Sequence, residues 1–230
     1  MFNYITDIIS LVFPETCAGC SRALLNTEKT ICLHCLSNLP VRLSLKSKDL
    51  MQRFYGRLTL AEAHAFLLFK RKGLTQNLLH AIKYKGNQAL AIELGLLFGI
   101  QCKALSMYSG VDLIVPVPLH KSKLRFRGFN QSALIAEGMS KGLEKPYNQN
   151  CVIRKIKTAT QTKKNRMERW KNVEHIFGVS PDPYLEEKVK NKHILLVDDV
   201  ITTGATLESC GQAILNAGAQ KLSIACLALA

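Results

Sequence analysis

Residues 193–206 have the sequence His-Ile-Leu-Leu-Val-Asp-Asp-Val-Ile-Thr-Thr-Gly-Ala-Thr, and this stretch decides the fold. Its four apolar residues, Ile194 to Val197, predict a strand that is buried on both faces, as in a parallel sheet. Two adjacent carboxylates, Asp198 and Asp199, are expected to end this strand. A loop of small residues follows, and a helical pattern of apolar residues begins at Leu207. This order of strand, acidic pair, loop and helix start is typical of an anion-binding site.

The loop from Thr202 to Thr206 has the composition of a phosphate-binding loop. Gly204 and Ala205 allow a ligand to approach the backbone closely, and Thr203 and Thr206 offer hydroxyl donors. Backbone N–H groups at the following helix start would face the ligand, and the helix dipole favours a phosphate there. The loop lacks the lysine of the Walker A motif, which argues against an NTPase of that type.

The two aspartates need a partner other than the phosphate, because like charges repel. The vicinal hydroxyls of a ribose suit them, with a divalent cation nearby on hard oxygen ligands. From Leu195 to Thr206 the sequence resembles the phosphoribosyl pyrophosphate (PRPP) motif of type I phosphoribosyltransferases. The resemblance implies that Asp198 and Asp199 hold the ribose 2′- and 3′-hydroxyls, that residues 202–206 hold the 5-phosphate, and that Mg²⁺ accompanies PRPP. The alternative is a βα turn whose aspartates point to solvent.

Length and composition allow one or two domains with a sizeable core. The chain has 230 residues, of which 47% are hydrophobic. Its formal net charge is +14, with 31 Lys and Arg residues against 17 Asp and Glu residues, which favours polyanionic partners. No apolar run of ~18 residues occurs, so a transmembrane helix and stable membrane insertion are not expected. The N-terminus lacks the basic region and cleavage site of a signal peptide, which predicts a cytoplasmic protein.

Apolar residues near the N-terminus have the spacing of a short amphipathic helix that ends before Pro14: Ile5, Ile8, Ile9 and Val12. This helix carries no basic face, so packing on the protein itself is favoured over a role at a membrane surface. We assign it, with the cysteine-rich segment that follows, to an N-terminal region of residues 1–60.

Two Cys-x-x-Cys pairs separated by eleven residues predict a structural zinc site. Cys17 and Cys20 form the first pair, and Cys32 and Cys35 form the second. At this spacing each pair clamps the ion, and four thiolates complete a closed tetrahedron of the zinc-ribbon type. His34 lies inside the second pair and is an alternative ligand. Disulfides are the other alternative, and the cytoplasmic prediction argues against them.

A second buried strand, Val111 to Val115, ends in a stiff turn that is followed by basic residues. The turn consists of Pro116, Val117 and Pro118, and the basic residues are Lys121, Lys123, Arg125 and Arg127. In type I phosphoribosyltransferases the turn after the first core strand binds pyrophosphate, and the resemblance implies this role for residues 116–118. A solvated basic loop is the alternative. A helix is expected to begin within Gly128 to Gln131.

Residues 154–171 hold eight Lys or Arg residues, one acid and few apolar residues. This composition predicts a mobile loop. Its position before the acidic pair resembles that of the flexible loop over bound PRPP, with Thr160, Gln161 and Arg169 as the matching residues. The basic residues 121–127 and this loop are also candidates for contact with single-stranded nucleic acid, the loop through Lys163, Lys164, Arg166 and Trp170. The alternative is that these charges serve only the phosphates of PRPP.

Further motifs extend the resemblance over nearly the whole chain. The cysteine module, Lys83 to Gly86, Pro116 to Pro118, Arg127 to Gln131 and the PRPP-like motif occur in an order similar to that of the ComF/GntX family of competence-associated phosphoribosyltransferase-like proteins. The resemblance implies a cytoplasmic bacterial protein that acts with single-stranded DNA during natural transformation. A DNA-uptake helicase and recombination proteins are the protein partners that it suggests.

The expected fold is α/β: a small four-cysteine zinc-ribbon module in residues 1–60 precedes a type I phosphoribosyltransferase-like parallel sheet flanked by helices in residues 61–230. Two functional hypotheses stay open. One is a PRPP-binding competence protein, and the other is an active phosphoribosyltransferase that transfers a 5-phosphoribosyl group to an unidentified nitrogen acceptor. Thr202 stands where several purine phosphoribosyltransferases carry an acidic general base. The sequence indicates no catalytic residue and no acceptor, and pyrophosphate release separates the two hypotheses.

Overall fold

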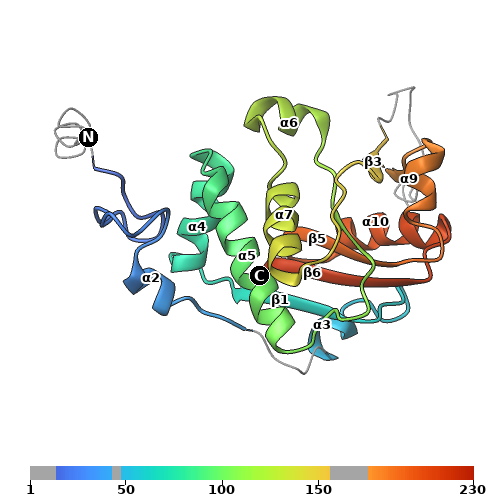
Figure 1. The fold of residues 1–230 in the computed structure, drawn as a ribbon, viewed down its shortest axis with the longest axis horizontal. Helices are drawn as coiled ribbons and strands as arrows, with labels where there is room; N and C mark the ends of the chain where they lie inside the picture. Colours follow the sequence, from blue (N-terminus) through green and yellow to red (C-terminus); the bar gives the residue numbers. More distant parts are fainter. Residues whose placement is uncertain (1–13, 43–47, 156–175) are drawn as a thin grey trace, which may run out of the picture.

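The centre of the described structure is a parallel sheet, as the sequence predicts, and this sheet has four strands (Figure 1). The computed structural model describes residues 14–42, 48–155 and 176–230. The strands lie in the order β1-β6-β5-β2, so β6 has a neighbour on each side although it comes last in the chain. Their bounds are β1 Ala63–Leu68, β2 Leu113–Pro116, β5 His193–Ile201 and β6 Lys221–Leu229.

Strand β5 is buried from His193 to Val197, as predicted for its apolar run. It is longer than the prediction and continues through the acidic pair to Ile201, because β6 pairs with this part as well. Asp198 lies opposite Cys226 in that pairing. The prediction that the two aspartates end the strand is therefore wrong, since they lie inside its last and less buried part.

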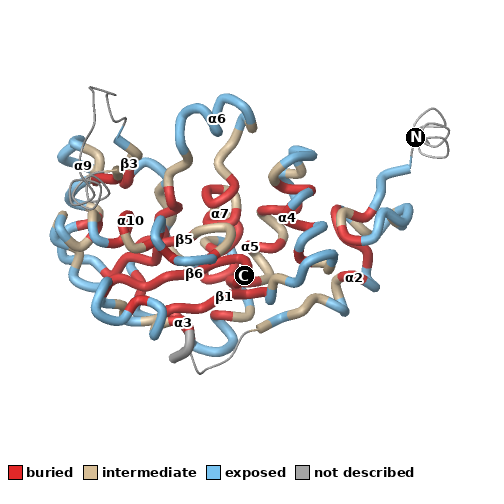
Figure 2. Tube along the Cα trace, turned by 180° about the vertical axis from the view of Figure 1, so that it is seen from behind, coloured by how far each residue is buried: buried red, intermediate tan, exposed pale blue. Residues whose placement is uncertain are grey.

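Side chains of the sheet alternate between two cores. In β5, Leu195 and Val197 pack in one core, and Ile194 and Leu196 pack in the other. Helices α4, α5 and α7 cover the first face, and α3 and α10 cover the second (Figures 1 and 2). Burial on both faces explains why these strands are apolar runs. The bounds of the helices are α3 Lys48–Gln52, α4 Leu74–Tyr84, α5 Gln88–Ala104, α7 Gln131–Leu143 and α10 Ala205–Asn216.

Helix α5 runs without a break through Gly95 and Gly99. These glycines face α7, because a Cβ atom on Gly95 would lie 2.2 Å from the carbonyl oxygen of Ile135. The contact is reciprocal: a Cβ atom on Gly138 of α7 would lie 2.1 Å from the carbonyl oxygen of Ile92. The two helix backbones are therefore closer than larger residues would permit. This contact fixes α7 against α5.

Three apolar side chains of residues 50–58 pack into the core, although this stretch also holds basic residues. Helix α3 and the turns after it bury Leu50, Phe54 and Leu58 beside α10. Their spacing of four residues places the three side chains on one side of the segment. Burial of large apolar side chains therefore outweighs the basic composition of this stretch.

The cysteine module, residues 14–42, packs on α4 and α5 and contains the short helix α2, Leu33–Ser37. Its buried cysteines belong to the same apolar cluster as residues of both helices. The side-chain amide of Asn77 in α4 donates a hydrogen bond of 2.8 Å to the carbonyl oxygen of Gly19. The core of the module is thus continuous with one core of the sheet.

Four shorter elements complete the described fold. Strands β3 and β4 form an antiparallel pair, and α6 and α9 are short helices. The expected N-terminal helix with Ile5, Ile8, Ile9 and Val12 lies outside the described residues. Across the described ranges, no helix has the length and apolar character needed to span a membrane. The bounds of the short elements are α6 Lys121–Arg127, β3 Val152–Arg154, β4 Phe177–Val179 and α9 Pro183–Glu187.

Candidate functional site

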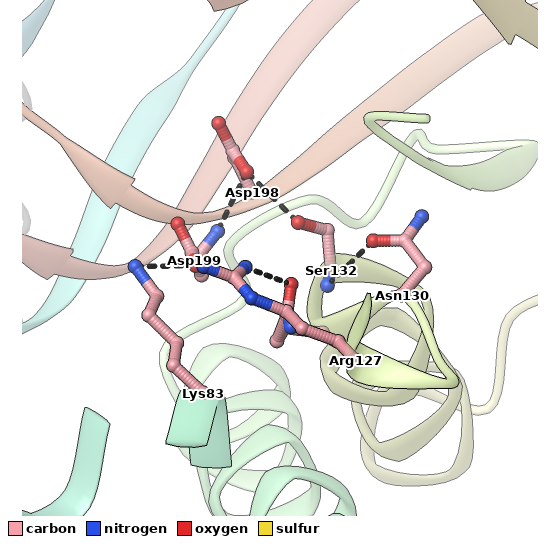
Figure 3. Close-up of polar contacts among 7 residues, drawn as sticks. Lys83, Arg127, Asn130, Ser132, Asp198 and Asp199 are labelled. Carbon is pink, nitrogen blue, oxygen red and sulfur yellow. Dashed lines mark hydrogen bonds and ion pairs between the residues drawn. The ribbon is translucent and has the colours of Figure 1, made fainter. Parts of the chain in front are cut away.

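Side chains from several segments meet beside the acidic pair of β5 (Figure 3). The pair lies toward the carboxyl end of a central strand, where open α/β sheets bind their ligands. Lys83 comes from the last turn of α4, and Asn130 and Ser132 come from the start of α7. Arg127, the last residue of α6, reaches the same region. The fold thus brings residues that are far apart in the sequence to one end of the sheet.

Each aspartate of the pair has its own polar partners. Asp198 Oδ1 accepts hydrogen bonds of 2.8 Å from the hydroxyl of Ser132 and of 2.8 Å from the backbone N–H of Asp199. Asp199 Oδ2 lies 2.7 Å from the ammonium of Lys83, and both of these side chains are largely buried. A positive charge in the last turn of α4 is also favourable for the helix dipole. One hydroxyl and one cation therefore hold the pair in place.

The surroundings of Asp198 favour its protonated form. Its partly buried position is the largest cause and the charge of Asp199 is the next, and together they raise its pKa from 3.8 to about 7. The hydroxyl of Ser132, the N–H of Asp199 and the ammonium of Lys83 act in the opposite direction. Near neutral pH Asp198 is therefore partly protonated.

The loop between β5 and α10 is exposed on its outer side and supported on its inner side. Gly204, the N-cap of α10, has a left-handed φ of +83°, and a Cβ atom there would lie 3.0 Å from the ring of Phe54. A guanidinium nitrogen of Arg53 donates a hydrogen bond of 2.8 Å to the carbonyl oxygen of Thr202. The first turn of α10 presents backbone N–H groups at this loop, which suits an anion. Gly204 is buried, and the exposed loop residues are Thr202, Thr203, Ala205 and Thr206.

The turn after β2 is connected to the start of α7. The side-chain nitrogen of Asn130 donates a hydrogen bond of 3.0 Å to the carbonyl oxygen of Val117, and its Oδ1 accepts one of 3.2 Å from the N–H of Ser132. Since Ser132 also binds the acidic pair, the turn and the pair belong to one hydrogen-bonded arrangement. The sequence placed Pro116 in this turn, but Pro116 is the last residue of β2. Pro116 and Val117 are buried, and Pro118 is partly buried.

A buried amide at the start of α7 lacks a partner for one of its atoms. Gln131 is 1% exposed, and its Oε1 accepts a hydrogen bond of 2.9 Å from Arg127. Its Nε2 has no hydrogen-bond partner within the described part of the chain. A buried donor without an acceptor is costly, and an oxygen atom of a ligand would remove that cost. The amide thus fits an oxygen-rich ligand.

The basic residues after the turn lie on helix α6, whereas the alternative from the sequence was a solvated basic loop. Lys121, Lys123 and Arg125 are exposed, whereas Arg127 turns back and lies 5.7 Å from the ring centre of Tyr84. Arg127 therefore belongs to the site, and the other three form a surface beside it. The remaining candidates lie outside the described residues, namely Thr160, Gln161 and Arg169 for the flexible loop and Lys163, Lys164, Arg166 and Trp170 for nucleic acid.

The four cysteines predicted to bind metal lie together. The Sγ atoms of Cys17, Cys20, Cys32 and Cys35 are all within 4.8 Å of one another, and those of Cys20 and Cys32 are 3.7 Å apart. A tetrahedral zinc ion with bonds of ~2.3 Å separates its sulfur ligands by ~3.8 Å, so the group fits zinc. Burial raises the pKa of Cys17, but the N–H groups of Cys32, Cys20 and Gly19 lower it to about 6, which favours the thiolate. All four are free thiols, and His34, the alternative ligand, is exposed and does not belong to this group.

Several residues of the site could not be found in the sequence. Lys83 belongs to a motif that supports the family resemblance, but no local pattern predicts its contact with Asp199. The hydrogen bond of Ser132 and the support that Arg53 and Phe54 give to the loop also depend on tertiary packing. For Phe54, the sequence offers the four-residue spacing of Leu50, Phe54 and Leu58.

The site combines an exposed helix start for an anion, a carboxylate pair for hydroxyl groups or a cation, and nearby basic groups. Residues 130–230 match the Phosphoribosyl transferase domain family. The fold and the site therefore define a phosphoribosyltransferase-like protein with an additional cysteine module.

Related proteins place the chain more narrowly. It is 31% identical over 219 residues to DNA utilization protein YhgH of Escherichia coli (strain K12), covering 92% of this chain and 88% of that protein. It is 31% identical over 114 residues to competence protein F of Haemophilus influenzae, covering 49% and 48% of the two chains. It is 32% identical over 106 residues to competence protein ComFC of Bacillus subtilis (strain 168), covering 46% and 39%. The chain belongs to the ComF family, as the sequence resemblance implied.

Proposed function

We propose that this protein binds PRPP together with Mg²⁺ at the carboxyl end of β5. The observation that carries the proposal is the position of the acidic pair directly before the exposed loop and the start of α10. Carboxylate oxygens of Asp198 and Asp199 can accept hydrogen bonds from the ribose hydroxyls. Residues 202–206 offer backbone N–H groups and hydroxyls to the 5-phosphate.

The positive groups beside the pair suit the pyrophosphate part of the ligand. Lys83 lies beside Asp199, and Arg127 contacts Gln131 at the start of α7 (Figure 3). The free Nε2 donor of Gln131 can bind a ligand oxygen. The turn of residues 116–118 is the candidate for the pyrophosphate itself. Bound Mg²⁺ would bridge the charge of the phosphate oxygens next to the carboxylates.

Calorimetry with PRPP, with and without Mg²⁺, tests this assignment. We expect binding only with Mg²⁺, and Asp199→Asn should weaken it at least about tenfold, a loss of about 1.4 kcal/mol or more. The matched control is Glu187→Gln, which removes one exposed acid from α9. Equal affinity of Asp199→Asn and the wild type would remove the ribose role from the pair.

The same proposal includes action with single-stranded DNA during natural transformation. Its support is family membership, since the relatives are named a DNA utilization protein and competence proteins. The net charge of +14 and the exposed Lys121, Lys123 and Arg125 also suit a polyanion. A cytoplasmic location, and a DNA-uptake helicase and recombination proteins as partners, belong to this proposal.

Gel-shift titration with a single-stranded oligonucleotide at two salt concentrations measures this interaction. If about four phosphates are engaged, log affinity should fall against log salt with a slope near −3, from roughly −0.7 per contact. Saturating Mg²⁺–PRPP should leave most of the binding intact if the DNA surface is separate from the sugar-phosphate site. Complete loss of binding with PRPP would assign the charges to PRPP alone.

A second candidate function is transfer of the phosphoribosyl group, and the match of residues 130–230 to the phosphoribosyl transferase domain favours it. In that reaction the bond from the anomeric carbon to pyrophosphate breaks through an oxocarbenium-like state, and a nitrogen acceptor forms the new bond and loses its proton. A scan of nucleobases and nucleic acids for PRPP-dependent pyrophosphate release tests it. Release with an identified acceptor supports transfer, whereas binding without release supports the first function.

A further inference from the structure

Helix α6 projects away from the sheet and its covering helices (Figure 1). None of its residues is buried, and the helix is coloured as exposed along most of its length (Figure 2). Phe126 is 81% exposed and Leu124 is 41% exposed. Single exposed apolar residues are common on protein surfaces, so exposure alone decides nothing. What distinguishes Phe126 is its place on a projecting helix whose other side chains are mostly basic.

The helix is fixed at its two ends and not by burial. At its start, Nδ1 of His120 accepts a hydrogen bond of 3.2 Å from the N–H of Ser122 and lies 2.6 Å from the Ser122 hydroxyl. At its end, Gly128 with a φ of +78° donates a hydrogen bond of 2.8 Å to the carbonyl oxygen of Leu124. A helix of this length is not stable by itself in water. These two caps therefore stabilise helix α6, which exposes Phe126 to solvent.

The side chains around Phe126 indicate the chemistry of a partner. Lys121, Lys123 and Arg125 are exposed, and the helix contains no acid. Leu124 and Phe126 are two residues apart and therefore lie about 200° apart around the helix axis. Helix α6 thus has no apolar stripe of the kind that enters a membrane or packs on a partner helix. A single ring beside basic groups suits a stacked nucleic acid base whose phosphates contact the cations.

The residue after Phe126 connects this surface to the acidic pair. Arg127 lies over the ring of Tyr84, and Lys83, the neighbour of Tyr84, contacts Asp199. We propose that single-stranded nucleic acid binds across α6 with one base stacked on Phe126, so that the strand reaches the rim of the sugar-phosphate site. This inference rests on the proposed action with single-stranded DNA, and it adds the binding surface and the stacking residue.

Fluorescence anisotropy with a labelled oligothymidylate of about 20 nucleotides measures the contribution of Phe126. Phe126→Ala should weaken binding at least about fivefold, as expected for the loss of one stacked base. Phe126→Trp should retain the affinity. Leu124→Ala, on the opposite side of the helix, is the matched control and should change it by less than about twofold. The salt slope should stay unchanged in Phe126→Ala and should shrink by about 0.7 in Lys123→Gln.

An abasic oligonucleotide separates stacking from other effects of the substitution, because it keeps the phosphates and lacks the bases. The wild type and Phe126→Ala should bind it equally. The stacking role would be refuted if Phe126→Ala lost the same affinity, relative to the wild type, for the abasic oligonucleotide and for the oligothymidylate. Equal affinity of the two proteins for the oligothymidylate would refute it as well. Vesicles of anionic lipid test the membrane alternative: vesicle binding that Phe126→Ala abolishes, with unchanged DNA affinity, would assign the surface to a membrane.

Failure of this inference can be told apart from failure of the proposed function. If the wild type binds the thymidylate and Phe126→Ala binds it equally well, only the stacking surface is refuted. If the wild type shows no binding at low salt, the action with DNA is refuted together with the surface. The calorimetric test with PRPP is independent of both results.

Discussion

Replacing Asp198 with asparagine should stabilise the protein while weakening PRPP binding. The substitution keeps the shape of the side chain and an oxygen that can accept from Ser132 and from the N–H of Asp199. It removes the charge that the partly buried position and Asp199 disfavour. A residue that serves a ligand at the expense of folding stability is expected at a functional site.

The size and sign of the stability change in Asp198→Asn follow from the pKa of Asp198, which is raised from 3.8 to about 7. Between these values the folded protein binds more protons than the unfolded chain, so the contribution of this group is fully present below about pH 4 and is lost as pH rises through about 7. One pKa unit is about 1.4 kcal/mol, which sets an upper limit of about 4 kcal/mol. Solvent at the partly exposed side chain reduces this value. We expect the free energy of unfolding of Asp198→Asn to exceed that of the wild type by about 1–2 kcal/mol at pH ~8, which corresponds to an increase of about 2–8 °C in Tm.

Thermal unfolding of the wild type and Asp198→Asn between about pH 5 and about pH 8.5 provides the test. The Tm of Asp198→Asn should exceed that of the wild type by a small amount at about pH 5, and this difference should grow until about pH 7. Burial lowers the pKa of His193, so the contribution of His193 to stability increases with pH, in the opposite direction. His193 is present in both proteins, and its effect cancels in the difference. A difference in Tm that is absent, or that does not change with pH, would refute the reasoning.

Two further expectations concern the metal site and the helix contact. Elemental analysis should find about one zinc per chain, and the double variant Cys17→Ser, Cys20→Ser should lose it; full metal content in that variant would contradict the four-thiolate site. Gly138→Ala should lower the free energy of unfolding by about 1–3 kcal/mol, because its Cβ atom would meet the carbonyl oxygen of Ile92. The control Glu137→Ala, on the same helix, should change this free energy by less than about 0.5 kcal/mol. Equal denaturant midpoints for Gly138→Ala and the wild type would show that the helices can separate without cost.

The sheet and the cysteine cluster could be predicted because their causes are local in the sequence. Strands that are buried on both faces must be apolar runs, and Ile194 to Val197 is such a run. The four ligands of one ion need a fixed short spacing within each pair, which Cys17 and Cys20 show directly. The loop before α10 was found for the same reason, since a strand, small residues and a helix start follow one another in the chain.

The contacts that complete the site could not be predicted, because they join distant segments. Lys83 reaches Asp199 only because α4 and β5 are neighbours in the fold. The support of Gly204 by Phe54 requires the segment before β1 to pass beneath the loop. The length of β5 was misjudged for a similar reason, since pairing with β6 extends the strand through two charged residues that apolar periodicity would exclude.

The central place of β6 sets an order on the folding of a newly made chain. Strand β1 pairs with β6 through contacts such as Ala63 with Ile224, and β5 pairs with the other edge of the same strand. While the ribosome is still making residues 221–229, the edges of β1 and β5 that later pair with β6 are unpaired. These edges can pair with other chains. Contacts between residues so distant in sequence also form slowly. Until β6 emerges, the unpaired edges of β1 and β5 therefore favour aggregation of the nascent protein.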